Sequence, residues 1–191
     1  MITDPRLPPS DVSRIGAPDA PLLAQPSFDA GDPGPIVAVL AHVPELLELP
    51  LPFIGLVLGA SAIPARVKEL VVVRTSAGAG CQFCVDAHSV VALDTGLTIT
   101  EVRALRGELP LASAFPDVRE RALLGWVDLV SLRGAIRPAD RTTMLAHFED
   151  HQVVELTMVT AATLMLNRFC TALNVPTSPA VAARLAECGL S

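Results

Sequence analysis

Two cysteines and a histidine share a spacing that suits thiol chemistry. Cys81, Cys84 and His88 stand at positions i, i+3 and i+7, so on a helix both thiols and the imidazole lie along one face. The first cysteine would lie at the helix N-terminus, where unpaired N–H groups and the helix dipole favour a thiolate. A thiolate attacks peroxides, and a neighbouring thiol resolves the sulfenic acid that forms into a disulfide. The spacing therefore predicts a redox-active dithiol.

Glu69 precedes this motif on what is expected to be the preceding helix. If the chain folds back after that helix, the carboxylate approaches His88, orients the imidazole and passes protons. A zinc site built from both thiols and His88, with Glu69 as fourth ligand, is the metal-binding alternative. A closed site of four thiolates is disfavoured because the chain has no second C-x-x-C. We expect neither a metal nor a cofactor.

Helices are needed to position these residues, and the sequence favours an all-α fold. Pro64 suits the first turn of a helix that carries Glu69. The small residues Thr75–Gly80 are expected to end that helix and form a flexible linker. A second helix is predicted from Cys81 to about Thr95, so that the dithiol stands at its N-terminus. Other helical segments are expected at 36–47, 53–60, 98–105 (opened by a Thr98–Glu101 capping box), 117–132, 138–148, 151–173 and 179–188.

Residues 1–35 differ from the rest of the chain because they are rich in proline. Proline lacks an N–H and fixes its own φ, so this segment is not a long helix or a central strand. We expect an extended arm, either loose or laid over a neighbouring subunit, followed by a helical domain at 36–191.

The bulk composition excludes several classes of protein. The chain has 191 residues, 51% hydrophobic and 18% charged, which favours one folded domain. A net charge of −6 argues against a nucleic-acid binder, and no cluster of Lys or Arg marks a membrane-binding surface. The uncharged stretch 49–65 contains three prolines, so it is predicted to be a buried core helix rather than a membrane span.

The N-terminus and the cysteine content predict a cytoplasmic protein with reduced thiols. No charged start is followed by an apolar run. Thiols in the cytoplasm are reduced by default, so four cysteines imply no disulfide framework. Cys170 and Cys188 stand alone within helical patterns and are predicted to be buried structural residues.

A resemblance to a known family rests on the residues around the dithiol. The stretch RVKELVVVRTSAGAGCQFCVDAHSVVALDTGLTITEVRAL, from Arg66 to Leu105, looks like the core of the carboxymuconolactone decarboxylase family. The E-x11-C-x2-C-x3-H arrangement is similar to the motif of its alkylhydroperoxidase D (AhpD-like) branch, and it falls on Glu69, Cys81, Cys84 and His88. A weaker likeness continues over 147–176, whereas the proline-rich arm lies outside the resemblance.

The resemblance implies an all-helical fold, a homo-oligomer such as a trimer or hexamer, and reduction of hydroperoxides through the dithiol. It assigns the sulfenic acid to Cys84, the proton-donor and resolving role to Cys81, and a proton relay to Glu69 and His88. The helix dipole instead favours Cys81 as the more acidic thiol, so the sequence leaves the attacking cysteine open. The implied reductant is a dithiol partner, such as a lipoyl domain, or a peroxiredoxin.

One departure and two alternatives accompany this hypothesis. AhpD proteins carry a histidine just before the second cysteine, where this chain has Phe83, and the change bears on peroxidase activity and on the choice of reductant. The leading hypothesis is a thiol-dependent hydroperoxide reductase for alkyl rather than highly charged hydroperoxides. The alternatives are a decarboxylase-type enzyme for a small cyclic acid, which needs neither thiol, and a non-enzymatic redox-sensing oligomer.

Overall fold

The computed structural model describes residues 12–131 and 135–190, and in these ranges every regular element is a helix. The predicted all-α fold is therefore confirmed. The α-helices are α1 (Pro35–Leu40), α2 (Pro50–Leu58), α3 (Ala65–Ala79), α4 (Gln82–Asp94), α5 (Ile99–Leu105), α6 (Leu111–Ala114), α7 (Val118–Ser131), α8 (Pro138–Leu145), α9 (Asp150–Ala172) and α10 (Pro179–Glu187). Three short 3-10 helices are η1 (Ala17–Asp19), η2 (Gln25–Ser27) and η3 (Pro44–Leu47).

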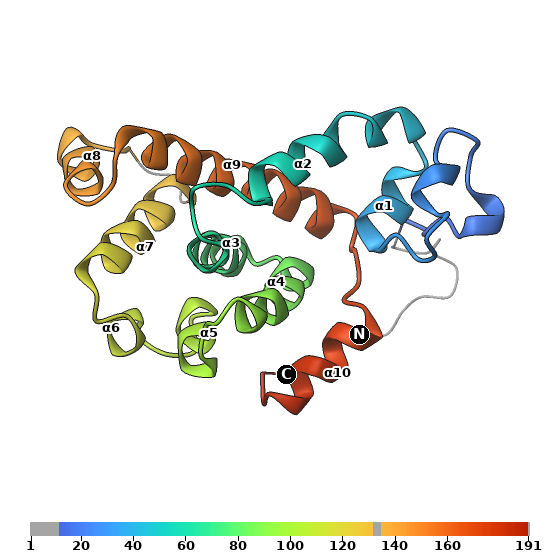
Figure 1. Cartoon of the computed structure of the whole chain (residues 1–191). Coiled ribbons are helices and arrows are strands. Elements are labelled where there is room, and N and C mark those ends of the chain that lie inside the picture. Colours follow the sequence, from blue (N-terminus) through green and yellow to red (C-terminus); the bar gives the residue numbers. More distant parts are fainter. Residues whose placement is uncertain (1–11, 132–134, 191) are drawn as a thin grey trace.

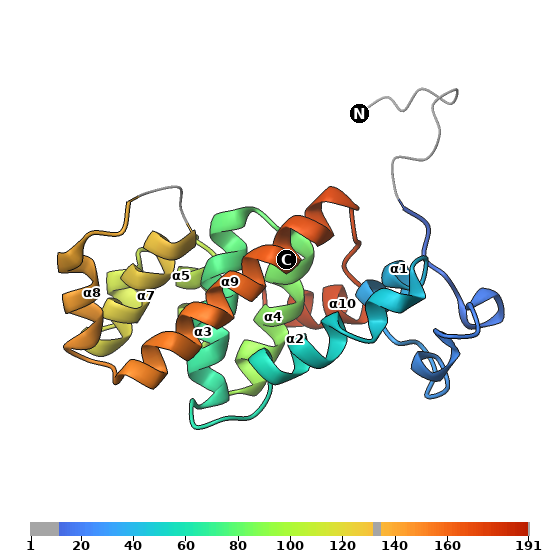
Figure 2. The same ribbon diagram turned by 90° about the horizontal axis from the view of Figure 1, so that it is seen from above.

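Helix α3 lies at the centre of the fold and contacts α4, α7 and α9 (Figures 1 and 2). Four consecutive side chains from Leu70 to Val73 are fully buried, so α3 is covered on opposite faces. Val71 and Val72 pack into a core with α7 and α9, which includes Leu123 and Leu156. Leu70 and Val73 pack into a second core with α4 and α5. Packing on both sides holds α3 in one orientation, in which Glu69 points toward α4.

The segment Thr75–Gly80 is not the flexible linker that its small residues predicted. Helix α3 continues through Ala79, and only Gly80 turns the chain, with a left-handed φ of 67° and ψ of 30°. Thr75 and Ser76 are fully buried. Small side chains let α9 approach α3 closely, and Asn167 of α9 donates a hydrogen bond to Ser76 Oγ over 3.0 Å. The small residues therefore serve packing, and the reversal is confined to Gly80 and Cys81.

The prediction of a buried core helix within 49–65 is wrong. Helix α2 buries only Val57, whereas Leu49 and Leu56 are each 78% exposed. Its end is held to the core by Lys68, whose ammonium donates to the carbonyls of Val57 and Gly59 over 3.0 and 2.7 Å. Pro50 and Pro52 lie in its first turn, Gly59 ends it with an extended backbone, and the short helix packs against α9.

The N-terminal segment also differs from the extended arm that its prolines predicted. No long helix forms in residues 12–34, as expected, but η1 and η2 fold this part back onto the protein. Ala24 and Phe28 are buried against Leu40 and Leu47. Residues 1–11 of the predicted arm lie outside the described residues, and the domain division at residue 35 stays a prediction.

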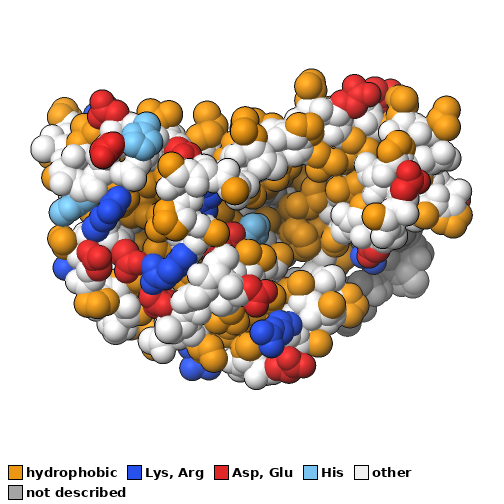
Figure 3. Space-filling model, in the orientation of Figure 1, with side chains coloured by type: hydrophobic (Ala, Val, Ile, Leu, Met, Phe, Trp, Pro, Cys, Tyr) orange, Lys and Arg blue, Asp and Glu red, His pale blue; other side chains and the backbone are white. Residues whose placement is uncertain are grey.

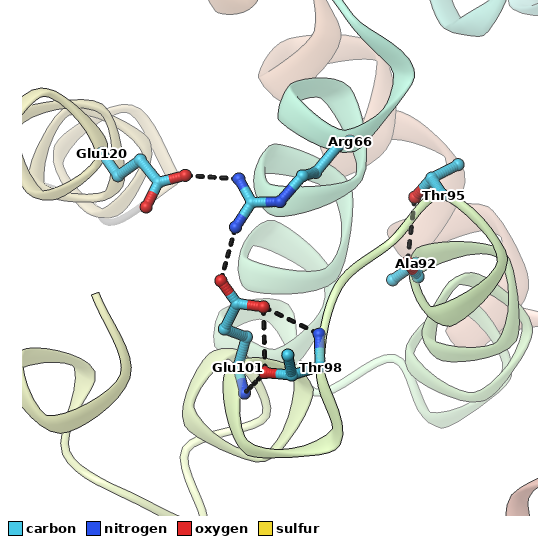
Figure 4. Close-up of polar contacts among 6 residues, drawn as sticks. All are labelled: Arg66, Ala92, Thr95, Thr98, Glu101 and Glu120. Carbon is cyan, nitrogen blue, oxygen red and sulfur yellow. Dashed lines mark hydrogen bonds and ion pairs between the residues drawn. The ribbon is translucent and has the colours of Figure 1, made fainter. Parts of the chain in front are cut away.

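Several predicted helix ends are confirmed at the level of single hydrogen bonds. Thr98 Oγ1 accepts from the Glu101 backbone N–H over 3.2 Å, while the Glu101 carboxylate accepts from the Thr98 N–H over 2.7 Å (Figure 4). Ser178 caps α10 by accepting from the backbone N–H of Val181. The expected helix over 36–47 is interrupted, because α1 ends at Leu40 and η3 begins only at Pro44.

Helix α9 is the one described helix long and apolar enough to cross a membrane. It packs against α2, α3, α4 and α7, and Leu156, Val159 and Cys170 are almost fully buried along it. This packing is typical of the central helix of a folded core, and such helices can be as long and as apolar as membrane-spanning ones.

Candidate active site

The dithiol lies where the chain reverses between α3 and α4. Cys81 is the N-cap residue of α4, with extended backbone dihedrals, and Cys84 stands in the first turn. The backbone N–H of Cys81 donates to the Ser76 carbonyl over 3.1 Å, and its own carbonyl accepts from Val85 over 3.0 Å. The motif is thus fixed at both ends by backbone hydrogen bonds, and both sulfurs lie at the positive end of the helix dipole.

A third cysteine completes this site, and it comes from α9. Cys170 packs in one buried cluster with Cys81 and Cys84, and Val39 and Val175 enclose the three sulfurs. The exposed fractions of Cys81, Cys84 and Cys170 are only 1%, 5% and 1%. Three thiols in apolar surroundings have few partners other than one another, so their charges are strongly linked.

The environment of the three thiols makes Cys81 the most acidic of them. Hydrogen bonding from Cys170, and then from Cys84, lowers the pKa of Cys81 well below its usual range, against the opposing effect of burial. Hydrogen bonding with Cys170 lowers the pKa of Cys84. Hydrogen bonding to Cys81 and burial raise it by more, so that the pKa of Cys84 is about 11. Hydrogen bonding to Cys81 and to Cys84 raises the pKa of Cys170. These directions favour Cys81 as the thiolate of the reduced site.

The predicted approach of Glu69 to His88 is confirmed. Nδ1 of His88 lies 3.0 Å from the Glu69 carboxylate, and only 8% of Glu69 is exposed. Because an ionised carboxylate only accepts, Nδ1 carries the hydrogen in this contact, and in the neutral ring Nε2 is then the basic nitrogen. His88 follows Cys84 by one helical turn on α4, so the imidazole and the thiols share a face. No hydrogen bond joins the imidazole to a thiol within the described part of the chain.

A small pocket of about 150 Å³ opens beside two of the three sulfurs. Cys81 and Cys170 line it together with Phe83, Thr171 and Val175. Cys84 does not line this pocket. The pocket therefore borders Cys81 and Cys170 rather than Cys84. Among the described residues, no group of three or more His, Cys, Asp or Glu side chains is arranged to hold a metal ion.

The comparisons with known proteins agree with this geometry. The sequence model of the carboxymuconolactone decarboxylase family matches residues 44–128, which include the whole Glu–Cys–Cys–His motif. Over these residues the chain is similar to the carboxymuconolactone decarboxylase family. No curated protein matches the chain significantly.

Solved structures of this family's AhpD-like type share the fold. A protein of unknown function from Agrobacterium tumefaciens, a candidate antioxidant defence protein AhpD, is 27% identical with a TM-score of 0.66, over 73% of this chain and 94% of its own. A peroxidase-related AhpD-core protein from Ralstonia eutropha is 18% identical with a TM-score of 0.78, over 92% and 96%. The debrominase Bmp8 is 21% identical with a TM-score of 0.74, over 93% and 97%. These likenesses establish the AhpD-like fold of the chain.

Sequence reasoning missed the contribution of α9 to this family site. Cys170 is buried, as predicted, but it does not stand alone, because it contacts both motif cysteines. Asn167 and Cys170 are three residues apart and therefore lie on one face of α9; this spacing was the available signal. Cys188, by contrast, packs against the core around Leu185 and Leu190, as a structural cysteine would.

Proposed function

We propose that the chain is a thiol-dependent hydroperoxide reductase. The observation that carries the proposal is the Cys81 thiolate, which faces a pocket and has a second thiol, Cys84, beside it. A low pKa supplies the nucleophile at neutral pH, and a neighbouring thiol supplies the resolving partner. The Glu69–His88 pair adds a group that moves protons next to this dithiol.

In the proposed cycle, the Cys81 thiolate attacks one oxygen of the hydroperoxide. The S–O bond forms, the O–O bond breaks, and the alkoxide leaves as an alcohol with a proton from solvent or His88. The Cys84 thiol then attacks the sulfenic acid; the S–S bond forms and the hydroxyl leaves as water with the thiol proton. Because the pKa of Cys84 is raised to about 11, this step needs a base, and His88 stands one helical turn away.

The attacking cysteine in this proposal is Cys81, whereas the family resemblance assigns the sulfenic acid to Cys84. Two observations support Cys81: hydrogen bonding from Cys170 and Cys84 lowers its pKa, and it lines the pocket that Cys84 does not reach. The two assignments differ in the species that a single substitution traps. In Cys84→Ser, the proposal predicts oxidation at Cys81.

The substrate and the reductant follow from the surroundings of the pocket and from the family. Phe83 and Val175 line the pocket, and these apolar side chains suit an alkyl hydroperoxide better than a highly charged one. The disulfide is returned to the dithiol by a second dithiol, such as a lipoyl domain, or by coupling to a peroxiredoxin. Repeated reduction requires a reducing compartment, which fits the cytoplasmic location that the sequence predicts.

We further propose that the enzyme is a homo-oligomer, a trimer or hexamer as in AhpD-like proteins. Exposed apolar side chains follow one side of α9, at Val154, Met158 and Met165, and continue on α2 at Leu49 and Leu56. Hydrophobic side chains also surround a hollow on the face shown in Figure 3. Exposed apolar side chains that are grouped on two neighbouring helices, here α2 and α9, are typical of subunit interfaces.

The direct test is the reduction of cumene hydroperoxide by dihydrolipoamide. The wild-type protein is expected to turn over, Cys81→Ser is expected to lose turnover, and Cys84→Ser is expected to lose most of it. Cys188→Ser serves as the matched control, because Cys188 lies outside the thiol cluster. Full activity in the Cys84→Ser variant would refute the proposal.

The alternatives predict different outcomes in the same experiment. A decarboxylase-type enzyme would act on a small cyclic acid without either thiol, so its activity would survive the double substitution Cys81→Ser/Cys84→Ser. A redox-sensing oligomer would form the disulfide and change its assembly without turning over peroxide. The structural likeness to a debrominase, solved also with 2,3,4-tribromopyrrole, adds reductive debromination by the same dithiol as a reaction to assay.

A further inference from the structure

Cys170 is the one buried nucleophile of the thiol cluster that the proposed cycle does not use. It stands on α9, far from the motif in sequence, yet it packs against both Cys81 and Cys84. It also lines the same pocket as Cys81. The sulfur that becomes oxidised in the pocket therefore has two thiol neighbours, one on its own helix and one on α9.

We propose that Cys170 is a second resolving thiol, which forms a disulfide with Cys81 across the α4–α9 contact. This inference rests on the proposed function, because it takes the Cys81 sulfenic acid as its starting point. In this step the Cys170 sulfur attacks the Cys81 sulfur, so that the S–S bond forms and the S–O bond breaks. The hydroxyl group and the Cys170 thiol proton leave together as water, and the oxidation state of the site equals that of a Cys81–Cys84 disulfide.

The two disulfides are connected by exchange within the cluster. A Cys84 thiolate attacks the Cys81 sulfur of the Cys81–Cys170 disulfide, and Cys170 leaves as a thiol once it takes up a proton. No external oxidant or reductant is consumed in this exchange. The pKa of Cys170 is raised by its hydrogen bonding to Cys81 and Cys84, so Cys84 is the faster partner in the wild-type protein, and Cys170 pairs mainly when Cys84 is absent or already oxidised.

The surroundings of the cluster favour such a link. The backbone near Cys170 is regular helix, and its last turn is closed by a hydrogen bond from Val175 N–H to the Cys170 carbonyl over 2.9 Å. Asn167 and Ser76 join α9 to α3 one turn earlier. Helix α9, which carries Cys170, is thus already held to α3, which leads directly into Cys81 and α4, and pairing requires movement of side chains within one packed group.

The test uses the full-length Cys84→Ser variant, reduced and then treated in two separate arms. One arm receives one equivalent of cumene hydroperoxide, and the other receives diamide, which joins neighbouring thiols without peroxide chemistry. Non-reducing peptide mapping by mass spectrometry is expected to show a Cys81–Cys170 disulfide in both arms, with Cys188 free. Cys84→Ala is the second variant, and far-ultraviolet circular dichroism checks that each remains helical.

The outcomes separate this inference from the proposed function. A Cys81–Cys170 link with diamide but no oxidation by peroxide would support the pairing and overturn the peroxidase. A Cys81 sulfenic acid that is captured by dimedone, while Cys170 stays free in both arms, would support the peroxidase and overturn the pairing. The double substitution Cys84→Ser/Cys170→Ser is expected to give the trapped sulfenic acid only; a disulfide to Cys188 in that protein would overturn the assignment of Cys170.

Discussion

Helix α3 carries two charged contacts three residues apart, and they differ in what they can do. Arg66 bridges the carboxylates of Glu101 on α5 and Glu120 on α7 (Figure 4). Glu69, on the next turn, pairs with His88 on α4. Both contacts hold a neighbouring helix to α3. Only the second contains an imidazole, which can both accept and donate a proton, and it stands one helical turn from Cys84.

On the same helix, the contacts of Arg66 hold the structure together, whereas the Glu69–His88 pair can take part in chemistry. Desolvation opposes the charge of Arg66, but its two carboxylate partners outweigh that effect and raise the pKa of the guanidinium. Its charge is therefore permanent, and the contact only fixes geometry. Glu69 is almost buried and holds one imidazole nitrogen, which leaves the other to move protons. The predictions below test this division, beginning with the thiols that the Glu69–His88 pair is proposed to serve.

The largest effect is expected from Cys81→Ser. A serine hydroxyl is not ionised at neutral pH, so the nucleophile is lost, and we expect kcat/KM for cumene hydroperoxide to fall at least about a thousandfold. Cys84→Ser is expected to retain the first reaction with peroxide but to turn over much more slowly with dihydrolipoamide, because Cys170 is a less reactive resolving thiol than Cys84. Stopped-flow measurement of peroxide consumption distinguishes the two. Multiple turnovers in Cys81→Ser would show that another group attacks the peroxide.

Glu69→Gln is expected to have the next largest effect. The amide does not hold His88 as a carboxylate does, so proton transfer is impaired and kcat falls roughly a hundredfold, with a changed pH profile of kcat. Arg66→Gln is the matched control on the same helix, and its kcat is expected to stay unchanged. Equal losses of kcat in the two variants would remove the distinction between the contacts.

Cys170→Ala is expected to raise the pKa of Cys81. Loss of one donor to a charged acceptor costs about 1.5–3 kcal/mol, which corresponds to roughly one to two pKa units. Because a lowered pKa keeps Cys81 ionised as the pH falls, the variant should lose its thiolate at higher pH than the wild type. Cys170→Ser retains a donor and is expected to restore most of the difference. The pH dependence of the rate of sulfenic acid formation measures both, and identical profiles would contradict the hydrogen bonding assigned to Cys170.

The smallest effect is expected from Arg66→Gln on stability. About a third of the Arg66 side chain is exposed, so solvent screening limits the contact, and a loss of about 1 kcal/mol in the free energy of unfolding is expected. Urea denaturation measures this loss, with Arg137→Gln as a control at an ion pair whose arginine side chain is 74% exposed. A loss of several kcal/mol would mean that the network organises α5 and α7 beyond fixing their positions.

The features that the sequence predicts correctly are those formed by residues close together in the chain. The C-x-x-C motif, His88 and the helix caps are local patterns, so the chain order alone places them. The approach of Glu69 to His88 required one further assumption, that α3 and α4 pack antiparallel, and the structure confirms it. These positions are also the ones that the family model covers.

The features that escaped prediction depend on contacts between distant segments. Cys170 belongs to the site only because α9 packs on α4, and a single apolar helix pattern does not reveal its neighbour. The segment Thr75–Gly80 has loop-like composition, yet α9 needs small side chains there, so packing overrode local preference. The exposed face of α2 was not predicted, because the same apolar sequence pattern occurs in buried helices and in helices with an exposed apolar face.

The central claim is that Cys81 is the thiolate of the reduced cluster, and an ultraviolet titration tests it most directly. Thiolate absorbance is followed against pH for the wild type and for Cys81→Ser, and the difference between the curves reports Cys81. We predict a midpoint well below the ordinary thiol value of about 8.5, so that Cys81 is fully ionised at neutral pH. A midpoint at the ordinary value, or a low-pH thiolate that persists in Cys81→Ser and disappears in Cys84→Ser, would contradict the account.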